Sequence, residues 1–354
     1  MFAQSERPQK FSEVVGEVEN SRILMTIAKN PTNTPNSLIL SGTFGSGKTS
    51  SARLLFKALN CDMVRAGKAS DICGVCPKCS AQVLQSRLYN EYDSSELDNK
   101  KSIDEIIGTF SYGTGGRWRV VVFDEAQLLP KSSQSALLKV LEEKRSLCKF
   151  VLCTTDPDDL MPTIRSRSLE LNYTTKPTPV VEEAILKCAE KHQIDLDPAS
   201  CSLIAQRSHG YMRDAYMLLD RFVLSGKDVF LRDTQNFQRS LSNFIIYTVA
   251  DTKPDKAILD TCLERLLSLP VATFRDEYQR FFLDLLRLSV LSGAEASPMI
   301  VYLGKTLRAN CPMLKIPMLV RYFTQNWVIQ GFTDDVSIQT TLLLLYTGFR
   351  DLRK

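Results

Sequence analysis

The sequence has 354 residues, of which 44% are hydrophobic and 24% charged, and Lys and Arg outnumber Asp and Glu by 44 to 40. This globular composition excludes a disordered, fibrous or collagen-like chain. A net charge of +4 is too small to indicate a nucleic-acid partner, so any contact with DNA depends on local basic patches.

The N-terminus has no basic start followed by an apolar core, so we expect no secretion signal. No run of about 18 apolar residues occurs, which predicts that no helix spans a membrane. The expected location is therefore the cytoplasm.

Strands and helices alternate through the first half of the chain. Short apolar runs at 37–40, 120–123 and 150–153 are typical of buried strands. Helical patterns occupy 18–29, 48–60, 103–110 and 132–143. Alternation of this kind predicts an α/β domain over residues 1–174, with a parallel sheet and helices on both faces.

The pattern changes after residue 173. Residues 174–179 resemble a linker, and helices are expected at 180–191, 197–208 and 211–225. Gly226 suits the position just after the last of these helices. We expect a small helical domain at 175–233 and an all-α domain at 234–354, with helical patterns such as 313–328 and 336–349.

Residues 42–49 match the phosphate-binding pattern G-x-x-x-x-G-K-[ST], between a predicted strand and a predicted helix. Lys48 is expected to reach the β- and γ-phosphates, and the Thr49 hydroxyl to bind Mg²⁺. A chance glycine turn is the alternative, which the strand–loop–helix context disfavours. The residues expected to hold the nucleotide here are Gly42, Thr43, Phe44, Gly45, Ser46, Gly47, Lys48, Thr49 and Ser50.

Two acidic residues follow the strand at 120–123. Asp124 is placed to orient the Mg²⁺ shell, and Glu125 to polarise an attacking water. A solvent-exposed strand end is the alternative for this pair alone. With a phosphate loop upstream, the catalytic interpretation is favoured.

Four cysteines, Cys61, Cys73, Cys76 and Cys79, crowd into residues 61–79. Such spacing in a reducing compartment favours a metal over disulfides, and four thiolates suit one structural zinc. Free thiols are the main alternative, and an iron–sulfur cluster is a smaller one.

Seven segments together resemble the ATPase subunit of a sliding-clamp loader, of the bacterial gamma/tau type in the AAA+ superfamily. They are residues 7–16, the phosphate loop, Cys-Gly-Val-Cys-Pro-Lys-Cys at 73–79, 135–143, 154–157, Ser166-Arg167, and Gly-Tyr-Met-Arg-Asp-Ala at 210–215. The resemblance extends from residue 7 to about residue 220. The residues at 127, 144 and 168 depart from the family's pattern, and the loop at 61–73 is longer. A divergent, phage-encoded member, working in a host cytoplasm, is one interpretation.

The resemblance implies further roles at the nucleotide. Thr155 resembles sensor 1, Arg213 the sensor 2 arginine that acts in cis, and Arg167 the arginine finger that acts on a neighbouring subunit. From spacing alone, either arginine could be a surface salt-bridge partner. The adenine pocket would be lined by Arg7, Pro8, Val14 and Val15.

The family's working form is a five-subunit spiral joined through C-terminal helical collars. ATP binding opens a sliding clamp, and primer–template DNA triggers hydrolysis and release. Lys100 and Lys101 are candidates for DNA-backbone contact, as are Lys131, Ser132 and Ser133; a solvated turn is the alternative. A clamp-binding helix is expected within 80–89.

Two other functions are compatible with parts of this sequence. One is a catalytically silent clamp-loader subunit, and the other a different AAA+ DNA-remodelling ATPase, such as a helicase loader or branch-migration motor. Intact Lys48, Thr49, Asp124 and Glu125 favour an active ATPase over the silent subunit. The cysteine module and Ser166-Arg167 favour a clamp loader over the other motors.

Overall fold

A computed structural model describes residues 1–80, 84–97, 100–108, 114–142, 147–227, 229–230 and 240–244, and residues 261, 262, 264, 266, 278, 281 and 305. The side chains of residues 100–102, 139 and 142 are outside this description. The chain divides into two compact units, Met1–Leu224 and Ser225–Lys354. Most of the expected all-α domain at 234–354, including the helices at 313–328 and 336–349, lies outside the described residues.

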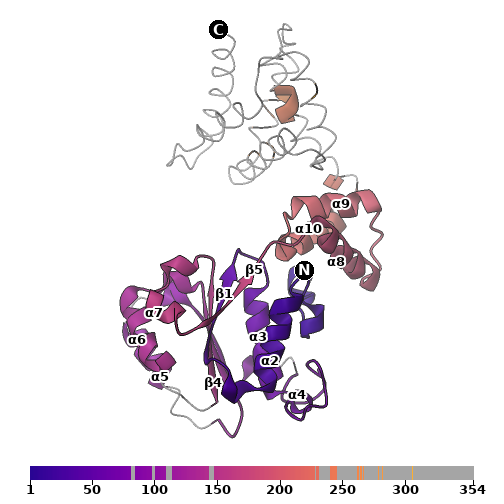
Figure 1. Cartoon of the computed structure of the whole chain (residues 1–354). Coiled ribbons are helices and arrows are strands. Elements are labelled where there is room, and N and C mark those ends of the chain that lie inside the picture. Colours follow the sequence, from indigo (N-terminus) through magenta and orange to yellow (C-terminus); the bar gives the residue numbers. More distant parts are fainter. Residues whose placement is uncertain are drawn as a thin grey trace, which may run out of the picture. The chain divides into compact units, whose positions relative to one another are not determined.

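Five parallel strands form the sheet of the first unit (Figure 1). They are β1 (Ser37–Gly42), β2 (Tyr89–Asp93), β3 (Arg119–Asp124), β4 (Cys148–Thr154) and β5 (Leu169–Tyr173), in the order β2-β3-β4-β1-β5. The three strands predicted from apolar runs are β1, β3 and β4, which form the centre of the sheet. The sequence patterns did not identify the two edge strands.

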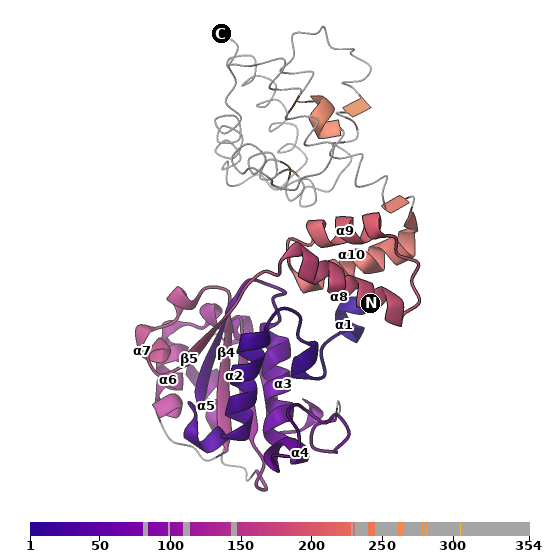
Figure 2. The ribbon, with the colours of Figure 1, turned by 45° about the vertical axis from the view of Figure 1, so that its right-hand side comes forward.

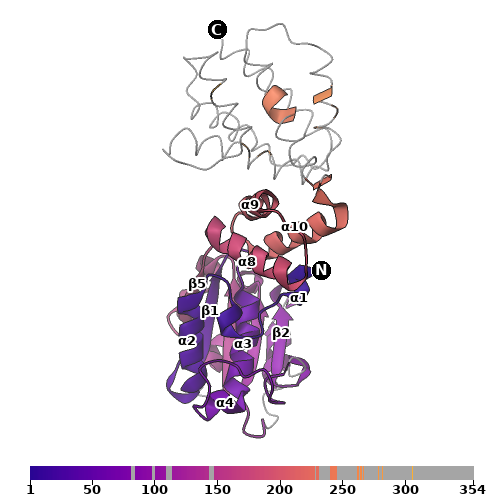
Figure 3. The same ribbon diagram turned by 90° about the vertical axis from the view of Figure 1, so that its right-hand side faces the viewer.

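Helices cover both faces of the sheet, as predicted (Figures 1 and 3). One face packs against α2 (Val18–Lys29), α3 (Lys48–Asn60) and α4 (Asp62–Arg65), around side chains such as Leu38, Leu40 and Val122. The other packs against α5 (Lys100–Gly108), α6 (Lys131–Glu142) and α7 (Pro162–Arg165), around Ile39, Val121 and Phe123. Consecutive strand residues alternate between the two cores, which is why the central strands β1, β3 and β4 are buried on both faces.

Short helical turns complete the unit. They are α1 (Phe2–Ser5) and the 3₁₀ helices Phe11–Glu13, Pro31–Asn33, Ser94–Glu96, Ala126–Leu128 and Pro157–Asp159. None of the helices that the structure describes is long and apolar enough to cross a membrane.

Three further helices follow the sheet: α8 (Thr178–Lys191), α9 (Pro198–Arg207) and α10 (Met212–Ser225). They match the three helices expected there to within a few residues. The Asp197 side chain caps α9 by accepting from the backbone N–H of Ser200 at 3.2 Å. Gly226 has φ 76°, the left-handed conformation expected after a helix.

The segment between the sheet and α8 is packed rather than loose. The buried Lys176 ammonium donates to the Glu17 carboxylate and, at 2.8 Å, to the carbonyl of Thr174. Its backbone N–H donates to the carbonyl of Gly210 at 2.9 Å. A Cβ on Gly210 would lie 2.3 Å from the Lys176 carbonyl oxygen, so only glycine fits this crossing. These contacts hold the start of α10 close to the sheet.

Candidate functional site

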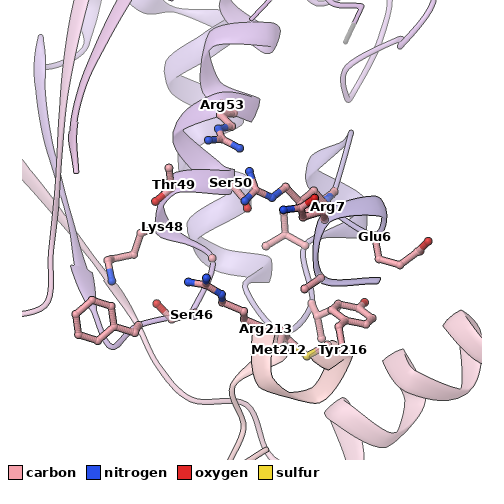
Figure 4. A pocket seen from close by; sticks show the side chains of 18 of the residues that line it. Glu6, Arg7, Ser46, Lys48, Thr49, Ser50, Arg53, Met212, Arg213 and Tyr216 are labelled. Atoms are coloured by element: carbon pink, nitrogen blue, oxygen red, sulfur yellow. The ribbon is translucent and has the colours of Figure 1, made fainter. Parts of the chain in front are cut away.

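A cavity of about 420 Å³ opens where β1 and β3 end, beside the N-terminal segment and the start of α10 (Figure 4). Its lining includes every residue from 44 to 50. The other lining residues are Met1, Ala3, Gln4, Glu6, Arg7, Pro8, Glu13, Val14, Val15, Arg53, Glu91, Asp124, Glu125, Met212, Arg213, Tyr216 and Met217.

The predicted phosphate loop joins β1 to α3 at this cavity. Gly42 has φ 145°, and a Cβ there would lie 2.2 Å from the carbonyl oxygen of Tyr173, so the loop can leave the strand only through glycine. Gly47 precedes the helix with φ 107°. The first backbone N–H groups of α3 have no partner within the helix, and together with the helix dipole they form an anion site.

Lys48 is the first residue of α3, and its side chain contacts the phosphate loop. Its Nζ donates to the carbonyls of Gly42 at 2.6 Å and Thr43 at 2.9 Å. Burial lowers the pKa of Lys48, and the nearby Cys153, Glu125 and Asp124 oppose that shift. A phosphate is a stronger acceptor than a carbonyl, so the ammonium is placed to exchange one for the other.

Thr49 and Asp124 meet at the base of the cavity, as expected for a Mg²⁺ pair. The Thr49 hydroxyl donates to Asp124 Oδ2 at 3.1 Å. Burial raises the pKa of the Asp124 carboxyl, the Thr49 hydrogen bond lowers it, and the charges of Glu125 and Glu91 raise it further. A divalent cation would relieve this crowding of carboxylates, and hydroxyl and carboxylate oxygens are the ligands that Mg²⁺ takes.

Glu125 connects to Thr155 through one side chain that the sequence marked only as a departure. Gln127 Nε2 donates to Glu125 Oε2 at 2.7 Å and to Thr155 Oγ1 at 2.9 Å. Glu125 itself has φ 50°, a left-handed conformation that a glutamate rarely adopts. The structure thus brings the expected water-polarising acid and the expected sensor threonine into one hydrogen-bonded group.

The residues expected at the adenine, Arg7, Pro8, Val14 and Val15, all line the cavity. Residues 2–6, which precede this part of the lining, contact the helices α8 and α10 (Figure 2). The Glu6 carboxylate accepts from Lys191 Nζ at 2.9 Å and pairs with His192 Nε2 at 2.7 Å. The backbone N–H of Phe2 donates to Asp220 at 3.0 Å. One wall of the cavity is therefore tied to α8 and α10.

The two expected arginines have different surroundings. Arg213 is the second residue of α10 and lies beside the phosphate loop, with its Cβ 3.1 Å from where a Cβ on Gly45 would lie (Figure 4). Arg167 is exposed and absent from the cavity lining, and its Nη1 donates to the carbonyl of Thr163 at 3.0 Å.

The sequence analysis did not identify two charged residues that line the cavity, Arg53 and Glu91. Arg53 forms a two-point ion pair with Glu91, at 2.7 and 2.9 Å, and Tyr89 donates to Glu91 at 2.7 Å. Arg53 follows Thr49 by one helical turn, so the sequence could have placed its side chain near the phosphate loop. The sequence could not have identified Glu91 as its partner, because strand β2 was not predicted.

The four cysteines of residues 61–79 converge. Their sulfur atoms all lie within 4.8 Å of one another, with Cys79 Sγ 3.5 Å from Cys73 Sγ and 3.3 Å from Cys76 Sγ. Four sulfurs on one zinc, at about 2.3 Å each, would be about 3.8 Å apart, so the cluster needs little adjustment to hold the ion. Burial raises the pKa of the Cys73 thiol, but the backbone N–H groups of Cys76 and Val75 lower it to about 6.

The expected DNA and clamp contacts are only partly visible. Lys100 and Lys101 begin α5, but their side chains lie outside the described residues. Lys131 and Ser132 are exposed at the start of α6, whereas Ser133 is buried and cannot contact DNA, so that assignment was wrong. Residues 81–83 of the expected clamp helix lie outside the described residues. Residues 84–85 are 3₁₀-helical, 86–88 form a bend and a turn, and Tyr89 begins β2, so no α-helix occupies 84–89.

Comparisons with known proteins point to one family. Residues 18–176 match the model described as "DNA polymerase III, delta subunit". The chain is 33% identical over 231 residues to DNA polymerase III subunit tau of Escherichia coli, which covers 64% of this chain and 35% of that protein. It is 30% identical over 312 residues to DNA polymerase III subunit gamma of Buchnera aphidicola, which covers 85% of this chain and 82% of that protein. The chain thus spans about a third of the first relative and most of the second.

Solved structures share the fold. The RuvB Holliday junction branch migration motor of Thermotoga maritima matches with a TM-score of 0.50 and 19% identity, over 90% of this chain and 91% of that one. Together with the parallel sheet and the phosphate loop, this likeness gives the nucleotide-binding part an AAA+ P-loop ATPase fold, for which nucleotide and Mg²⁺ are the expected ligands.

Proposed function

Because the chain belongs to the gamma/tau family of DNA polymerase III subunits, we propose that it is an ATPase subunit of a clamp-loader complex. ATP binding opens a sliding clamp, and hydrolysis triggered by primer–template DNA releases it. The observation that carries this proposal is the cavity in which Lys48, the Thr49–Asp124 pair and Glu125 converge.

Six residues in or beside the cavity are assigned tasks: Lys48, Thr49, Asp124, Glu125, Thr155 and Arg213. Lys48 would exchange its carbonyl partners for the β- and γ-phosphates. Thr49 and Asp124 would hold Mg²⁺, which would neutralise charge on those phosphates. Glu125 takes a proton from the attacking water. Thr155 and Arg213 contact the γ-phosphate region, where cations and hydroxyl donors stabilise the transition state.

Other parts act on or through neighbours. Arg167 is assigned to the nucleotide of the adjacent subunit, which agrees with its exposure outside this chain's own cavity. We assign residues 175–233 as the lid and 234–354 as the collar that joins a pentameric spiral. Lys100 and Lys101 are the proposed DNA-backbone contacts, which would be salt-dependent and independent of base sequence.

We also assign one structural zinc to Cys61, Cys73, Cys76 and Cys79. The convergence of their sulfur atoms and the backbone N–H donors to Cys73 support the assignment. Four thiolates leave no open position, so the ion would serve folding rather than catalysis.

The test is steady-state ATP hydrolysis by the chain with its co-subunits, with and without sliding clamp and primed DNA. Strong stimulation by both together, lost in Lys48→Ala and Glu125→Gln, is the expected result. ATP binding without hydrolysis would identify a silent subunit, and hydrolysis indifferent to clamp and DNA a different motor. Arg167→Ala alone should lose hydrolysis. Mixing it with subunits that carry Lys48→Ala should restore part of the activity, because the intact Arg167 of a Lys48→Ala subunit can serve the intact site of its Arg167→Ala neighbour.

A further inference from the structure

Gln127 occupies the centre of the hydrogen-bonded group between β3 and β4. It lies in the 3₁₀ helix Ala126–Leu128, directly after Glu125 and Ala126. Its Nε2 donates to Glu125 and Thr155, and its Oε1 accepts from the Thr154 hydroxyl at 2.9 Å and from the backbone N–H of Thr155 at 3.4 Å. The Gln127 amide therefore links Glu125, after β3, to Thr154 and Thr155 at the end of β4.

The chemistry of the partners fixes which way the amide faces. A carboxylate only accepts and a backbone N–H only donates, so Nε2 must face Glu125 and Oε1 must face the Thr155 backbone. A flipped amide would put oxygen against the carboxylate of Glu125 and N–H against N–H.

This orientation also sets the hydroxyl of Thr155. Because Thr155 Oγ1 accepts from Gln127, its own hydrogen points away from Gln127 and remains available to an acceptor. Gln127 Nε2 donates to Oε2 of Glu125, and no other described residue donates a hydrogen bond to this carboxylate. One amide thus leaves a directed donor on Thr155 and a free acceptor, Oε1, on Glu125.

We propose that Gln127 is the positioning residue for hydrolysis, which holds Glu125 and Thr155 in their working orientations together. The proposal rests on the ATPase function argued above. Glu125 Oε1 accepts the proton of the attacking water as the water oxygen bonds to the γ-phosphorus and the bond from phosphorus to ADP breaks. Thr155 donates to an oxygen of the γ-phosphoryl group that is being transferred to water. Gln127 holds the side chains of Glu125 and Thr155 in place.

Gln127→Met tests the idea, because methionine keeps the length of the side chain and removes the amide. In the complex with clamp and primed DNA, we expect kcat for ATP hydrolysis to fall at least about 10-fold, against the 10²–10⁴-fold that a general base contributes. The Kd for ATP, measured with Mg²⁺ before turnover, should change less than about twofold, because Gln127 does not line the cavity.

Gln134→Met is the matched control. Gln134 is a buried amide whose Nε2 donates to the Leu129 carbonyl at 3.0 Å and whose Oε1 accepts from the Met161 backbone at 2.8 Å. It supports neighbouring backbone without contacting Glu125. Its loss should lower Tm and leave kcat of the folded complex unchanged.

A second readout separates positioning from support of the fold. In a Glu125→Gln background, adding Gln127→Met should lower kcat by a smaller factor than it does in the wild-type chain, because one of the two groups that it positions is already disabled. Full additivity, an unchanged kcat in Gln127→Met, or an equal loss in Gln134→Met would overturn the proposal.

Failure of the proposed function is distinguishable from failure of this inference. Hydrolysis that ignores clamp and DNA removes the clamp-loading function but still reports the effect of Gln127 through basal turnover. A wild-type complex that binds ATP and never hydrolyses it overturns both.

Discussion

Lys176→Met should destabilise the first unit by about 3–5 kcal/mol, the usual cost of removing one partner of a buried ion pair. The Lys176 and Glu17 side chains are 3% and 6% exposed. Without the ammonium, the Asn20 amide, at 2.6 Å, is the one hydrogen-bond donor left to the Glu17 carboxylate among the residues that the structure describes, and water cannot replace the lost partner. For a unit of this size, the loss corresponds to a fall in Tm of roughly 6–20 °C.

The predicted loss of stability arises from the buried Glu17 carboxylate that is left without its cation, and a second variant tests this cause. In Lys176→Met with Glu17→Gln, no buried charge remains, and most of the stability should return. Scanning calorimetry of wild type, both single variants and the double variant gives the coupling energy.

Lys187→Met is the control. Lys187 pairs with Glu183 one turn away on α8, with side chains 71% and 67% exposed. Its loss should leave Tm almost unchanged, because water screens an exposed pair of this kind. If the double variant were as unstable as Lys176→Met, or if Lys187→Met cost as much, the burial argument would be wrong.

Three further predictions concern other parts of the first unit. Metal analysis of protein purified without chelator should find about one zinc per chain and none in Cys76→Ser, which should also lower Tm; full zinc in the variant would exclude this cluster. Although burial raises the pKa of Asp71, three backbone N–H donors outweigh it and hold that pKa below its ordinary value. Its stabilisation is thus present above the unfolded pKa of about 4 and lost as pH falls through the folded pKa, so the Tm difference between wild type and Asp71→Asn should shrink below about pH 4. Arg53→Met leaves the Glu91 charge unpaired beside Asp124 and should weaken ATP binding about 5- to 10-fold at low salt, with recovery when Glu91→Gln is added; no recovery would show that Arg53 acts otherwise.

The central sheet and the core of the site were predictable because their signals are local. β1, β3 and β4 are buried on both faces and therefore read as apolar runs. The phosphate loop is one continuous segment whose glycines, lysine and threonine have to stand at fixed spacing.

The edge strands escaped prediction for the opposite reason. β2 contains a tyrosine, an asparagine and a glutamate in succession, and β5 alternates apolar and polar residues. At an edge, part of the strand faces solvent or polar partners, so no apolar run develops. The pairing of Glu91 with Arg53 was lost along with β2.

The sequence by itself determined the elements of the nucleotide site, since short-range spacing specifies a phosphate loop, an acid pair and a cysteine quartet. Only the tertiary structure decided which distant groups complete them. Gln127 meets Thr155 because β3 and β4 are neighbours, and Arg213 reaches Gly45 because Lys176 holds Gly210 against the sheet. Such contacts join residues far apart in the chain, and no local pattern encodes a distance that depends on how strands and helices pack.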